Sequence, residues 1–600
     1  MKLKTMAISA LASSLILAGC QTSDKPQTLA ASGWPAAERE KYMAIEGMAI
    51  APSNPEATGE MGAVTGSFHG YAQRAGLEAL KQGGTSADAA MTTALTQVAL
   101  GAGAVISYFG IMSVVHYDAA SGEVSYMNAS WDTVRGEKDP MSIPGRIDAY
   151  GEGLYGHGEP SGRTALVGGF MKGVEAMNER FGKLPFARLF EPSIEIAEQG
   201  VPFTQNLMKY LEPRRNDLAR LPETKAVFTN EKGEWVKEGE LFKQPALAKT
   251  LRAVANQGAD YMYTGPWAKK LVEKVQAEGG FMTLEDLANY EVIWGEPLVG
   301  EHNGHQVYLN GKPAYGGVHA IEALHLSKAA KIKELGHWSK SAESFKHMAN
   351  LLNNGNITFL EAAMPDVVKQ MLPGVDTSIE GRLKPENAEK IWKLMQAGVP
   401  LAQWADTGTK HSDTVVAVDQ WGNMTAVTHT INCVVWGKTG IFVDGVSIGD
   451  PAVSQKAIIA KAGPGTRLPD PTEQGLVFKD GEPVLAFTSM SMGLHLETAQ
   501  SLINYMDFGM SPKEASDAPS MLYPKIDMDW EKGTATQTVR VMKGAFSKSL
   551  LDQTGLPYLE IEPKERRLAQ GLWAGIERDP KTGKLKAASH KYTTGQAVAY

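Results

Sequence analysis

The sequence predicts an α+β protein in which stacked, mainly antiparallel sheets are covered by helices. Three observations predict this fold class. The chain has 600 residues with 43% hydrophobic and 21% charged side chains, an ordinary globular composition in a chain longer than one compact core usually needs. Alternating apolar runs separated by Asp- and Gly-containing turns recur along it as hairpins. Segments with helical periodicity lie between the hairpins.

The predicted hairpins each join two strand-like runs through a short polar turn, in which Asp and Gly adopt the conformations that tight connections need. The paired runs are 113–117 with 123–126, 414–418 with 424–431, 476–478 with 483–487, and 572–577 with 584–588. Helices are predicted over 71–82, 86–100, 168–181, 186–199, 247–257, 266–278, 318–335, 494–506 and 512–518. Ser86 is expected to be an N-cap. Residues 451–471 are rich in Gly and Pro and are expected to form a long loop.

The N-terminus resembles a bacterial export signal. An apolar run from Met6 to Ala18 is too short to span a bilayer, and Leu-Ala-Gly before Cys20 resembles a lipobox. Residues 1–20 are therefore expected to be a lipoprotein signal peptide with Cys20 as the lipidated residue, and residues 21–46 a tether. By analogy with sorting in Gram-negative cells, the residues after Cys20 favour the outer membrane, facing the periplasm.

The composition excludes several classes of function. The 59 basic and 67 acidic side chains give a net charge of −8, which leaves no basic surplus for binding nucleic acid. Two cysteines, Cys20 and Cys433, exclude a disulfide scaffold. His302 and His305 lie in a turn-like segment without carboxylate or cysteine partners, and no glycine-rich phosphate loop follows a strand. No metal or organic cofactor is expected, and the only expected membrane contact is the lipid anchor.

The hairpin around residues 420–422 brings hydroxyl side chains together. If these residues form a three-residue loop with Gly422 in the left-handed conformation, Asp419 pairs with Asn423. Because side chains alternate along a strand, four hydroxyl residues then share one face. They are Ser412 opposite Thr430 and Thr414 opposite Thr428. A face rich in Thr is also typical of ordinary strands, so the pattern alone leaves both interpretations open.

A second serine lies in a motif of its own. Gly445 to Gly449 matches the G-x-S-x-G elbow of α/β-hydrolases, which needs a strand before it and a helix after it. Asp450 and Pro451 follow instead, so we expect a chance match. A serine hydrolase that uses Ser447 stays as an alternative.

Residues 408–432 resemble the γ-glutamyltranspeptidase (glutathione hydrolase) family, whose members are N-terminal-nucleophile hydrolases. The resemblance runs from about residue 47 to 600. It rests also on Gly47-Met-Ala, 75–90, 165–200, 283–290, Gly316-Gly-Val-His319, Asp507-Phe-Gly509 and Ala515-Ser-Asp-Ala-Pro519. The resemblance implies a four-layer αββα sandwich. It also implies a precursor that cleaves itself into a large subunit, containing 47–411, and a small subunit, 412–600, which remain together as a heterodimer.

The resemblance implies a nucleophile that supplies its own base. Cleavage before a Thr or Ser frees an α-amino group, which titrates near pH 8 and can accept the proton of the neighbouring hydroxyl. An ungapped count from Asp419 places the nucleophile at Ser412, where the family usually has Thr, and a gap of two would select Thr414. The strand register agrees with Ser412. Thr430 matches the residue that hydrogen-bonds the nucleophile, and Asn432 matches a substrate-binding residue.

The remaining family positions concern the substrate. Asp450 and Asp470 match substrate-binding positions, and the oxyanion glycines of the family fall at Ser491, Met492 and Gly493.

The family's arginine, which holds the glutamyl α-carboxylate, has no counterpart in Met127–Asp132, and Arg135 nearby has no assigned place. Losing a bidentate clamp removes a contact that sets substrate geometry. A γ-glutamyl amide such as glutathione is the first expectation for the substrate. An acylase with another acyl group, and a non-catalytic substrate-binding lipoprotein of the same fold, stay as alternatives.

Overall fold

A computed structural model describes residues 27–48, 56–145, 159–355, 357–358, 361, 365–398, 412–529, 534–563, 565 and 570–600. The predicted signal peptide and Cys20 lie outside these residues, as does the segment just before Ser412. In the described part of the chain, no helix combines the length and the apolar character needed to cross a membrane.

Two seven-stranded sheets form the centre of the molecule. All their strand pairs are antiparallel. The first sheet has the order β21 (Val598–Ala599), β2 (Ala63–Gly66), β10 (Asp413–Val418), β11 (Met424–Thr430), β3 (Ile111–Asp118), β4 (Glu123–Ala129), β7 (Ile293–Gly295). The second has the order β1 (Glu56–Gly59), β20 (Leu585–Ala588), β19 (Leu572–Arg578), β15 (Glu482–Met490), β14 (Glu473–Lys479), β9 (His305–Leu309), β8 (Leu298–His302).

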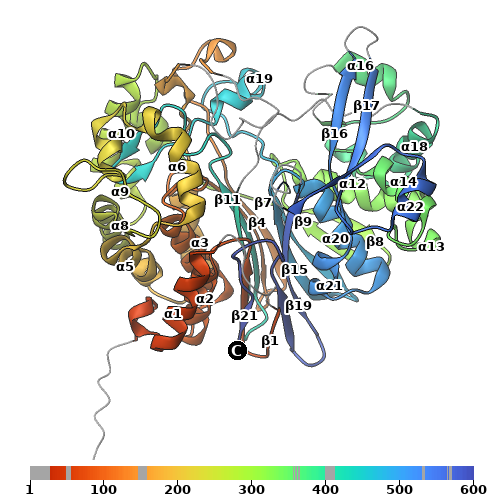
Figure 1. Ribbon diagram of the computed structural model, residues 1–600, viewed down its shortest axis with the longest axis horizontal. Coiled ribbons are helices and arrows are strands. Elements are labelled where there is room, and N and C mark those ends of the chain that lie inside the picture. The colour runs from red at the N-terminus through yellow and green to blue at the C-terminus, as the bar shows by residue number, and fades with distance from the viewer. Residues whose placement is uncertain are drawn as a thin grey trace, which may run out of the picture.

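Helices cover the outer face of each sheet, and the sheets lie between the two helical layers (Figure 1). The layer on the first sheet includes α2 (Gly70–Lys81), α3 (Ser86–Leu100), α4 (Phe170–Phe181), α5 (Glu191–Gln199), α8 (Pro245–Gln257) and α10 (Pro266–Ala277). The layer on the second sheet includes α12 (Gly316–Ala329), α14 (Ala342–Leu351), α18 (Pro385–Gln396) and α20 (Leu494–Phe508). A smaller sheet of β16 (Met521–Asp529), β17 (Thr534–Met542) and β18 (Tyr558–Ile561) adjoins this layer.

The side chains of β10 and β11 alternate between two apolar cores. Val415 and Val427 pack with the helices of the first sheet. Val416 and Met424 pack instead with Leu476 in the core between the sheets. Residues with even numbers on β10 and β11 therefore face the second sheet, and odd-numbered residues face the helices.

The predicted α+β fold and all the predicted hairpins are confirmed: β3–β4, β10–β11, β14–β15 and β19–β20 pair as expected. The αββα layering follows from the cores on both sides of each sheet. The predicted helices also form, although 186–199 begins as a 3₁₀ helix and 318–335 is divided into α12 and α13 (Ile332–Leu335).

Two local predictions were wrong. Thr85, not Ser86, is the N-cap of α3, because the Thr85 hydroxyl accepts the Asp88 N–H and the Asp88 carboxylate accepts the Thr85 N–H. The expected loop contains a helix, α19 (Ala452–Ala462), since its Pro and Gly residues lie at or beyond the ends of an Ala- and Ile-containing helical segment.

The described part of the expected tether, residues 27–46, belongs to the folded body. It forms η1 (Ala31–Gly33) and α1 (Ala36–Glu46), and Leu29 and Trp34 are buried in the core of the first helical layer. The tether prediction is corrected for these residues because the polar sequence around them contains a few large apolar side chains that anchor the segment.

Other helices of the described chain are α6 (Gln205–Leu218), α7 (Pro222–Val227), α9 (Asp260–Tyr263), α11 (Leu284–Ala288), α16 (Pro365–Met371), α17 (Ile379–Arg382), α21 (Pro512–Asp517) and α22 (Lys548–Thr554). The remaining strands are β5 (Val201–Pro202), β6 (Leu241–Phe242), β12 (Phe442–Val443) and β13 (Val446–Ser447).

Candidate active site

The register predicted for the β10–β11 hairpin is confirmed. Thr414 pairs with Thr428, and the Asp419 N–H donates to the Asn423 carbonyl over 3.2 Å. Gly422 has φ 88°, the left-handed conformation that the three-residue loop requires. Continued by one position, this register sets Ser412 opposite Thr430.

Ser412 and Thr430 lie at one end of the sandwich and on the face directed at the second sheet. Ser412 immediately precedes β10 and is partly exposed, whereas Thr430 ends β11 and is buried. The Thr430 hydroxyl accepts the Asn432 N–H over 2.9 Å, and Asn432 turns the chain with φ 46°. The site therefore joins a strand start, a strand end and the turn that follows it. The hydrogen bond expected between Thr430 and Ser412 stays a prediction.

Thr414, the alternative nucleophile, is held inside the sheet. Its side chain is fully buried, and its hydroxyl shares a hydrogen bond of 2.6 Å with the Ser67 hydroxyl. The Thr414 carbonyl accepts the Gln97 amide over 3.2 Å. Both its side chain and its backbone are thus committed to the fold, in contrast to the partly exposed Ser412.

Hydroxyl and amide side chains connect the two sheets beside this end. Thr428 and Thr488 share a hydrogen bond of 3.0 Å, and the Gln474 amide donates to the Ser113 hydroxyl over 2.7 Å. Beyond the Thr428–Thr488 contact, β11 runs to Thr430 and β15 runs to Met490. These polar contacts therefore fix the end of β15 across from the candidate nucleophile.

The predicted oxyanion residues form the turn between β15 and α20. Ser491 has φ 78°, a conformation that a residue with a side chain adopts at a cost of about 1–3 kcal/mol. Gly493 is the N-cap of α20, and its N–H donates to the Gln570 carbonyl over 3.3 Å. Ser491, Met492 and Gly493 thus lie at the positive end of a helix dipole, which favours negative charge.

Asp470 is a buried connection between loops. Its carboxylate accepts the Ser130 hydroxyl over 2.5 Å and the Asn128 amide over 3.2 Å. The N–H and hydroxyl of Thr472 also donate to it. Burial raises the pKa of Asp470. These contacts tie the start of β14 to the end of β4, next to the position where the family arginine is missing.

Arg467 supplies a guanidinium in that region, which sequence reasoning missed. Its Nε donates to Asp132 over 2.6 Å, and one terminal nitrogen donates to the carbonyl and side-chain oxygens of Asn128, both at 2.9 Å. The other terminal nitrogen donates to the Glu291 carbonyl over 2.7 Å. The guanidinium carbon lies over the Tyr290 ring, 4.6 Å from the ring centre. The sequence did not predict this contact, because Arg467 comes from a loop that is far along the chain from Asn128. Arg135 contacts Asp286 at 3.5 Å.

Asp450 lies close to the turn that carries Asn432. Its Oδ2 accepts the Lys438 N–H over 2.7 Å, and its own N–H donates to the Cys433 sulfur over 3.2 Å. Its Oδ1 is buried and has no hydrogen-bond partner among the residues that the structure describes. Burial raises the pKa of Asp450. The structure thus brings Asp450 and Asn432 together through Cys433.

Asp413 occupies the opposite face of β10 from Ser412. Its Oδ1 accepts the N–H groups of Thr414 at 2.8 Å and Phe68 at 3.2 Å. Burial raises the pKa of Asp413 to about 7, although the nearby His69 lowers it. An ionisable carboxyl therefore adjoins the candidate nucleophile. The alternation of side chains along the strand did not predict this feature from the sequence.

Ser447 does not have the exposed position of a nucleophile. It belongs to the short strand β13, is buried, and donates its hydroxyl to the Gly103 carbonyl over 2.7 Å. The strand–turn–helix arrangement of a nucleophile elbow is not formed around it. The match to G-x-S-x-G is therefore a coincidence of sequence.

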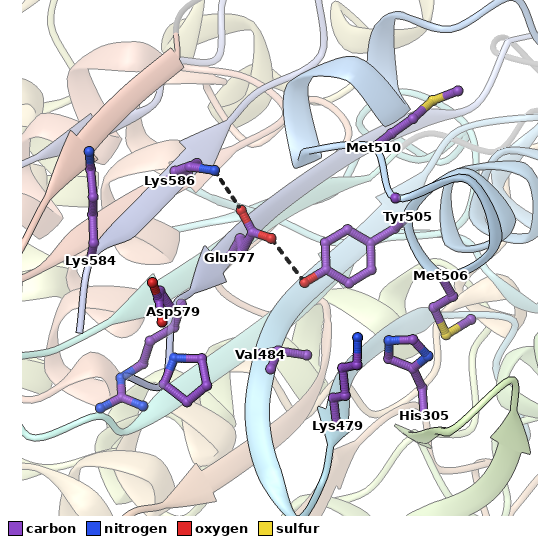
Figure 2. A pocket seen from close by; sticks show the side chains of 13 residues that line it. His305, Lys479, Val484, Tyr505, Met506, Met510, Glu577, Asp579, Lys584 and Lys586 are labelled. Carbon is purple, nitrogen blue, oxygen red and sulfur yellow. Dashed lines mark hydrogen bonds and ion pairs between the residues drawn. The ribbon is translucent and has the colours of Figure 1, made fainter. Parts of the chain in front are cut away.

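A surface cavity of about 390 Å³ lies at the other end of the second sheet (Figure 2). Its walls include the end of β14 at Lys479 and the end of β19 at Glu577. Glu577 accepts the Tyr505 hydroxyl over 3.2 Å and lies 3.3 Å from the Lys586 nitrogen (Figure 2). None of the predicted site residues lines this cavity.

An αββα sandwich with a hydroxyl residue at the start of a central strand is the arrangement of N-terminal-nucleophile hydrolases. Comparison with known proteins narrows the class: the family model described as gamma-glutamyltranspeptidase matches residues 72–600, and the chain belongs to that family. The resemblance inferred from the sequence, and the assignment to an enzyme of the γ-glutamyltransferase and glutathione hydrolase type, are confirmed.

Similar proteins carry more than one kind of name. The glutathione hydrolase proenzyme of Bacillus subtilis (strain 168) is 26% identical over 554 residues, covering 86% of this chain and 89% of the relative. The acylase ACY 1 proenzyme of Pseudomonas sp. (strain SE83) is 27% identical over 401 residues, covering 65% and 68%. The crystal structure of cephalosporin acylase from Bacillus halodurans has a TM-score of 0.69 at 21% identity and covers 92% of this chain and 98% of that one. This structural likeness shows the shared fold.

Proposed function

We propose that the chain is a self-processing amide hydrolase and acyltransferase whose nucleophile is Ser412, and that it acts on γ-glutamyl amides such as glutathione. One observation carries this proposal: Ser412 lies immediately before β10, and the hairpin register, continued by one position, sets it opposite Thr430 on the face directed at the second sheet. The partial exposure of Ser412 and the burial of Thr414 favour Ser412 over Thr414.

Cleavage of the peptide bond before Ser412 turns a strand start into a chain end. The new α-amino group titrates near pH 8, so near neutral pH a useful fraction accepts the hydroxyl proton. The serine oxygen attacks the substrate carbonyl and expels the amine, which leaves with a proton. Water or an acceptor amine then attacks the acyl-enzyme and restores the hydroxyl. The products of processing are residues 21–411 and 412–600, which form the heterodimer.

The turn of Ser491, Met492 and Gly493 is suited to stabilising the oxyanion. It lies at the N-terminus of α20, where backbone N–H groups and the helix dipole favour negative charge. We assign the role to the backbone N–H groups of this turn, whose last residue, Gly493, is the N-cap of α20. One such donor typically contributes about 3–4 kcal/mol to transition-state stabilisation.

Asn432 and Asp450 are the proposed substrate-binding groups. They adjoin through Cys433, and the Asp450 Oδ1 has no hydrogen-bond partner within the described chain, so it is able to accept from a substrate ammonium. Asp470 acts by holding its loop through Ser130 and Asn128.

A second candidate function is that of an acylase with a non-glutamyl acyl group. Arg467 stands in the region of the missing family arginine, but Asp132, Asn128 and the Glu291 carbonyl already accept its hydrogen bonds. A substrate without an α-carboxylate needs no such clamp. The name of a similar protein, the acylase ACY 1 proenzyme, favours this candidate as well.

We further propose that residues 1–20 are a lipoprotein signal and that Cys20 anchors the enzyme to the outer membrane on its periplasmic side. The lipobox-like sequence supports this assignment. In cells given radioactive palmitate, the wild-type chain should be labelled and a Cys20→Ser variant should not. Equal labelling of the two proteins would contradict the anchor.

The proposed function is tested by denaturing electrophoresis and a panel of chromogenic amides. Wild-type protein should give two fragments and release the amine from a γ-glutamyl amide, whereas Ser412→Ala should stay intact and inactive. Ser447→Ala is the matched control, and should process as wild type does. A single wild-type chain without activity would support a non-catalytic binding protein. Preference for other acyl amides would support the acylase.

A further inference from the structure

Two histidines and a glutamate converge on the helix side of the second sheet. His319 lies in the first turns of α12, His495 in the first turn of α20, and Glu473 begins β14. One potential ligand atom from each of the three lies within 4.8 Å of the other two. The His319 and His495 rings meet edge to face with centroids 4.3 Å apart. These residues are far apart in sequence, so no motif spacing revealed the cluster.

The cluster is enclosed and has unused ligand capacity. Glu473 is fully buried; its Oε1 contacts His495 Nδ1, while Oε2 has no hydrogen-bond partner among the described residues. The Nε2 atom of His495 is also buried without such a partner in that part of the chain. A fully buried carboxylate oxygen left without a donor is unfavourable, and this points to a cation that the side chains enclose.

The cluster is separate from the catalytic residues but close to them. On β14 and β15, Gln474 and Thr488 face the first sheet, so their neighbours Glu473 and Ser489, which pair with each other, face the helices. His495 follows shortly after the Ser491–Gly493 turn on the same helix. An ion at this position would therefore support the proposed oxyanion turn from behind without entering the space between the sheets.

We propose that His319, Glu473 and His495 bind a divalent transition-metal ion, with Zn²⁺ as the best match. Two imidazoles and one carboxylate form a donor set that Zn²⁺ accepts, with the fourth tetrahedral position left for water or another ligand. With bonds of about 2.0–2.1 Å, tetrahedral ligand atoms lie about 3.4 Å apart. The three ligand atoms, which lie within 4.8 Å of one another, would therefore move closer together on binding the ion. Ca²⁺ and Mg²⁺ fit less well because they prefer oxygen ligands.

Two features of the surroundings bear on the affinity. His319 and His495 both lie in the first turn of a helix, where the positive end of the helix dipole disfavours a cation. The Glu473 carboxylate offsets this effect at direct contact distance. Thr358 shares a hydrogen bond of 2.8 Å with His319 Nε2, which orients the imidazole in the way that neighbouring groups fix metal-binding histidines.

Direct titration with Zn²⁺ tests the site without reference to catalysis. Purified protein is stripped with a chelator and desalted, and Zn²⁺ is added in competition with a chromogenic zinc indicator. Wild type and Ser412→Ala should each bind one equivalent. Glu473→Gln and His495→Gln remove a ligand, so each should lose more affinity than the roughly 10–100-fold that the loss of an outer-shell partner costs. His347→Gln is the control, because His347 is a partly buried histidine on α14 whose Nδ1 contacts the Ala330 carbonyl.

Absence of a stoichiometric zinc site in wild type, or equal affinity in the Glu473 and His495 variants, would overturn the proposal. If either variant fails to fold, Co²⁺ substitution of the wild type decides. A bound Co²⁺ with the visible spectrum of a tetrahedral nitrogen–oxygen site supports it, and the spectrum of hexaaqua Co²⁺ refutes it. Because Ser412→Ala binds in the same way, a failure of the proposed catalysis would be distinguishable from a failure of the metal site.

Discussion

Among the residues around the proposed substrate-binding region, Arg467 is expected to contribute most to the free energy of unfolding. Replacing it with alanine removes the cation beside Asp132 and the donors to Asn128 and the Glu291 carbonyl. The Arg467 side chain is 7% exposed and that of Asp132 is 19% exposed, so the pair is largely shielded from water. Breaking such a pair from one side leaves an uncompensated charge and typically costs about 3–5 kcal/mol.

The partial exposure of Asp132 argues for the lower end of this range, about 3 kcal/mol, because water solvates part of the remaining charge. Arg467→Lys should recover only part of the loss, since an ammonium keeps the charge but cannot reproduce the forked contacts with Asp132 and Asn128. The loop that carries Asp470 should loosen in both variants.

Urea denaturation of the unprocessed Ser412→Ala chain measures these losses while keeping one polypeptide. Arg252→Ala is the control, because the Arg252–Glu198 pair is 57% and 42% exposed and should contribute less than about 1 kcal/mol. If Arg467→Ala lowers the free energy of unfolding by no more than Arg252→Ala does, the reasoning about the buried Arg467–Asp132 pair is wrong.

Three further predictions concern the hairpin and the second serine. Burial raises the pKa of Asp413 from near 4 to about 7, so its contribution to stability is full below pH 4 and is lost as the pH rises toward 7. Relative to Asp413→Asn, the Ser412→Ala precursor should lose on the order of 4 kcal/mol in urea unfolding between pH 4 and pH 8, and parallel pH profiles would refute this. Thr430→Val should slow fragment formation at least tenfold in a timed gel assay, because the nucleophile loses a hydroxyl partner; an unchanged rate would exclude that role. Ser447→Ala should cost about 1 kcal/mol in urea unfolding through the lost bond to Gly103, with processing intact; loss of fragmentation would revive Ser447 as nucleophile.

The sheets were predictable because their signals are local. Gly422 fixes the loop, the loop fixes the register, and alternation assigns Thr414 and Thr428 to one face, all from one continuous stretch of sequence. The helices followed from periodicity, with errors where a neighbouring residue makes the better cap, as at Thr85. The structure of 27–46 was missed since only a few apolar anchors, Leu29 among them, distinguish it from a tether.

The parts of the site that could not be predicted depend on contacts between distant segments. Arg467 reaches Asn128 from a loop 339 residues further along the chain, so its local sequence contains no sign of that role. The convergence of His319 with Glu473 and His495 likewise depends on how α12 packs against the second sheet. Burial, which raises the pKa of Asp413, also becomes known only when the layers are assembled.

N-terminal sequencing and intact-mass measurement of the purified wild-type enzyme test the central claim most directly. A small subunit that begins at Ser412 and ends at residue 600, together with amidase activity, is the predicted result. An active protein in which the peptide bond before Ser412 is whole, or whose small subunit begins at Thr414, would contradict the assignment of the nucleophile.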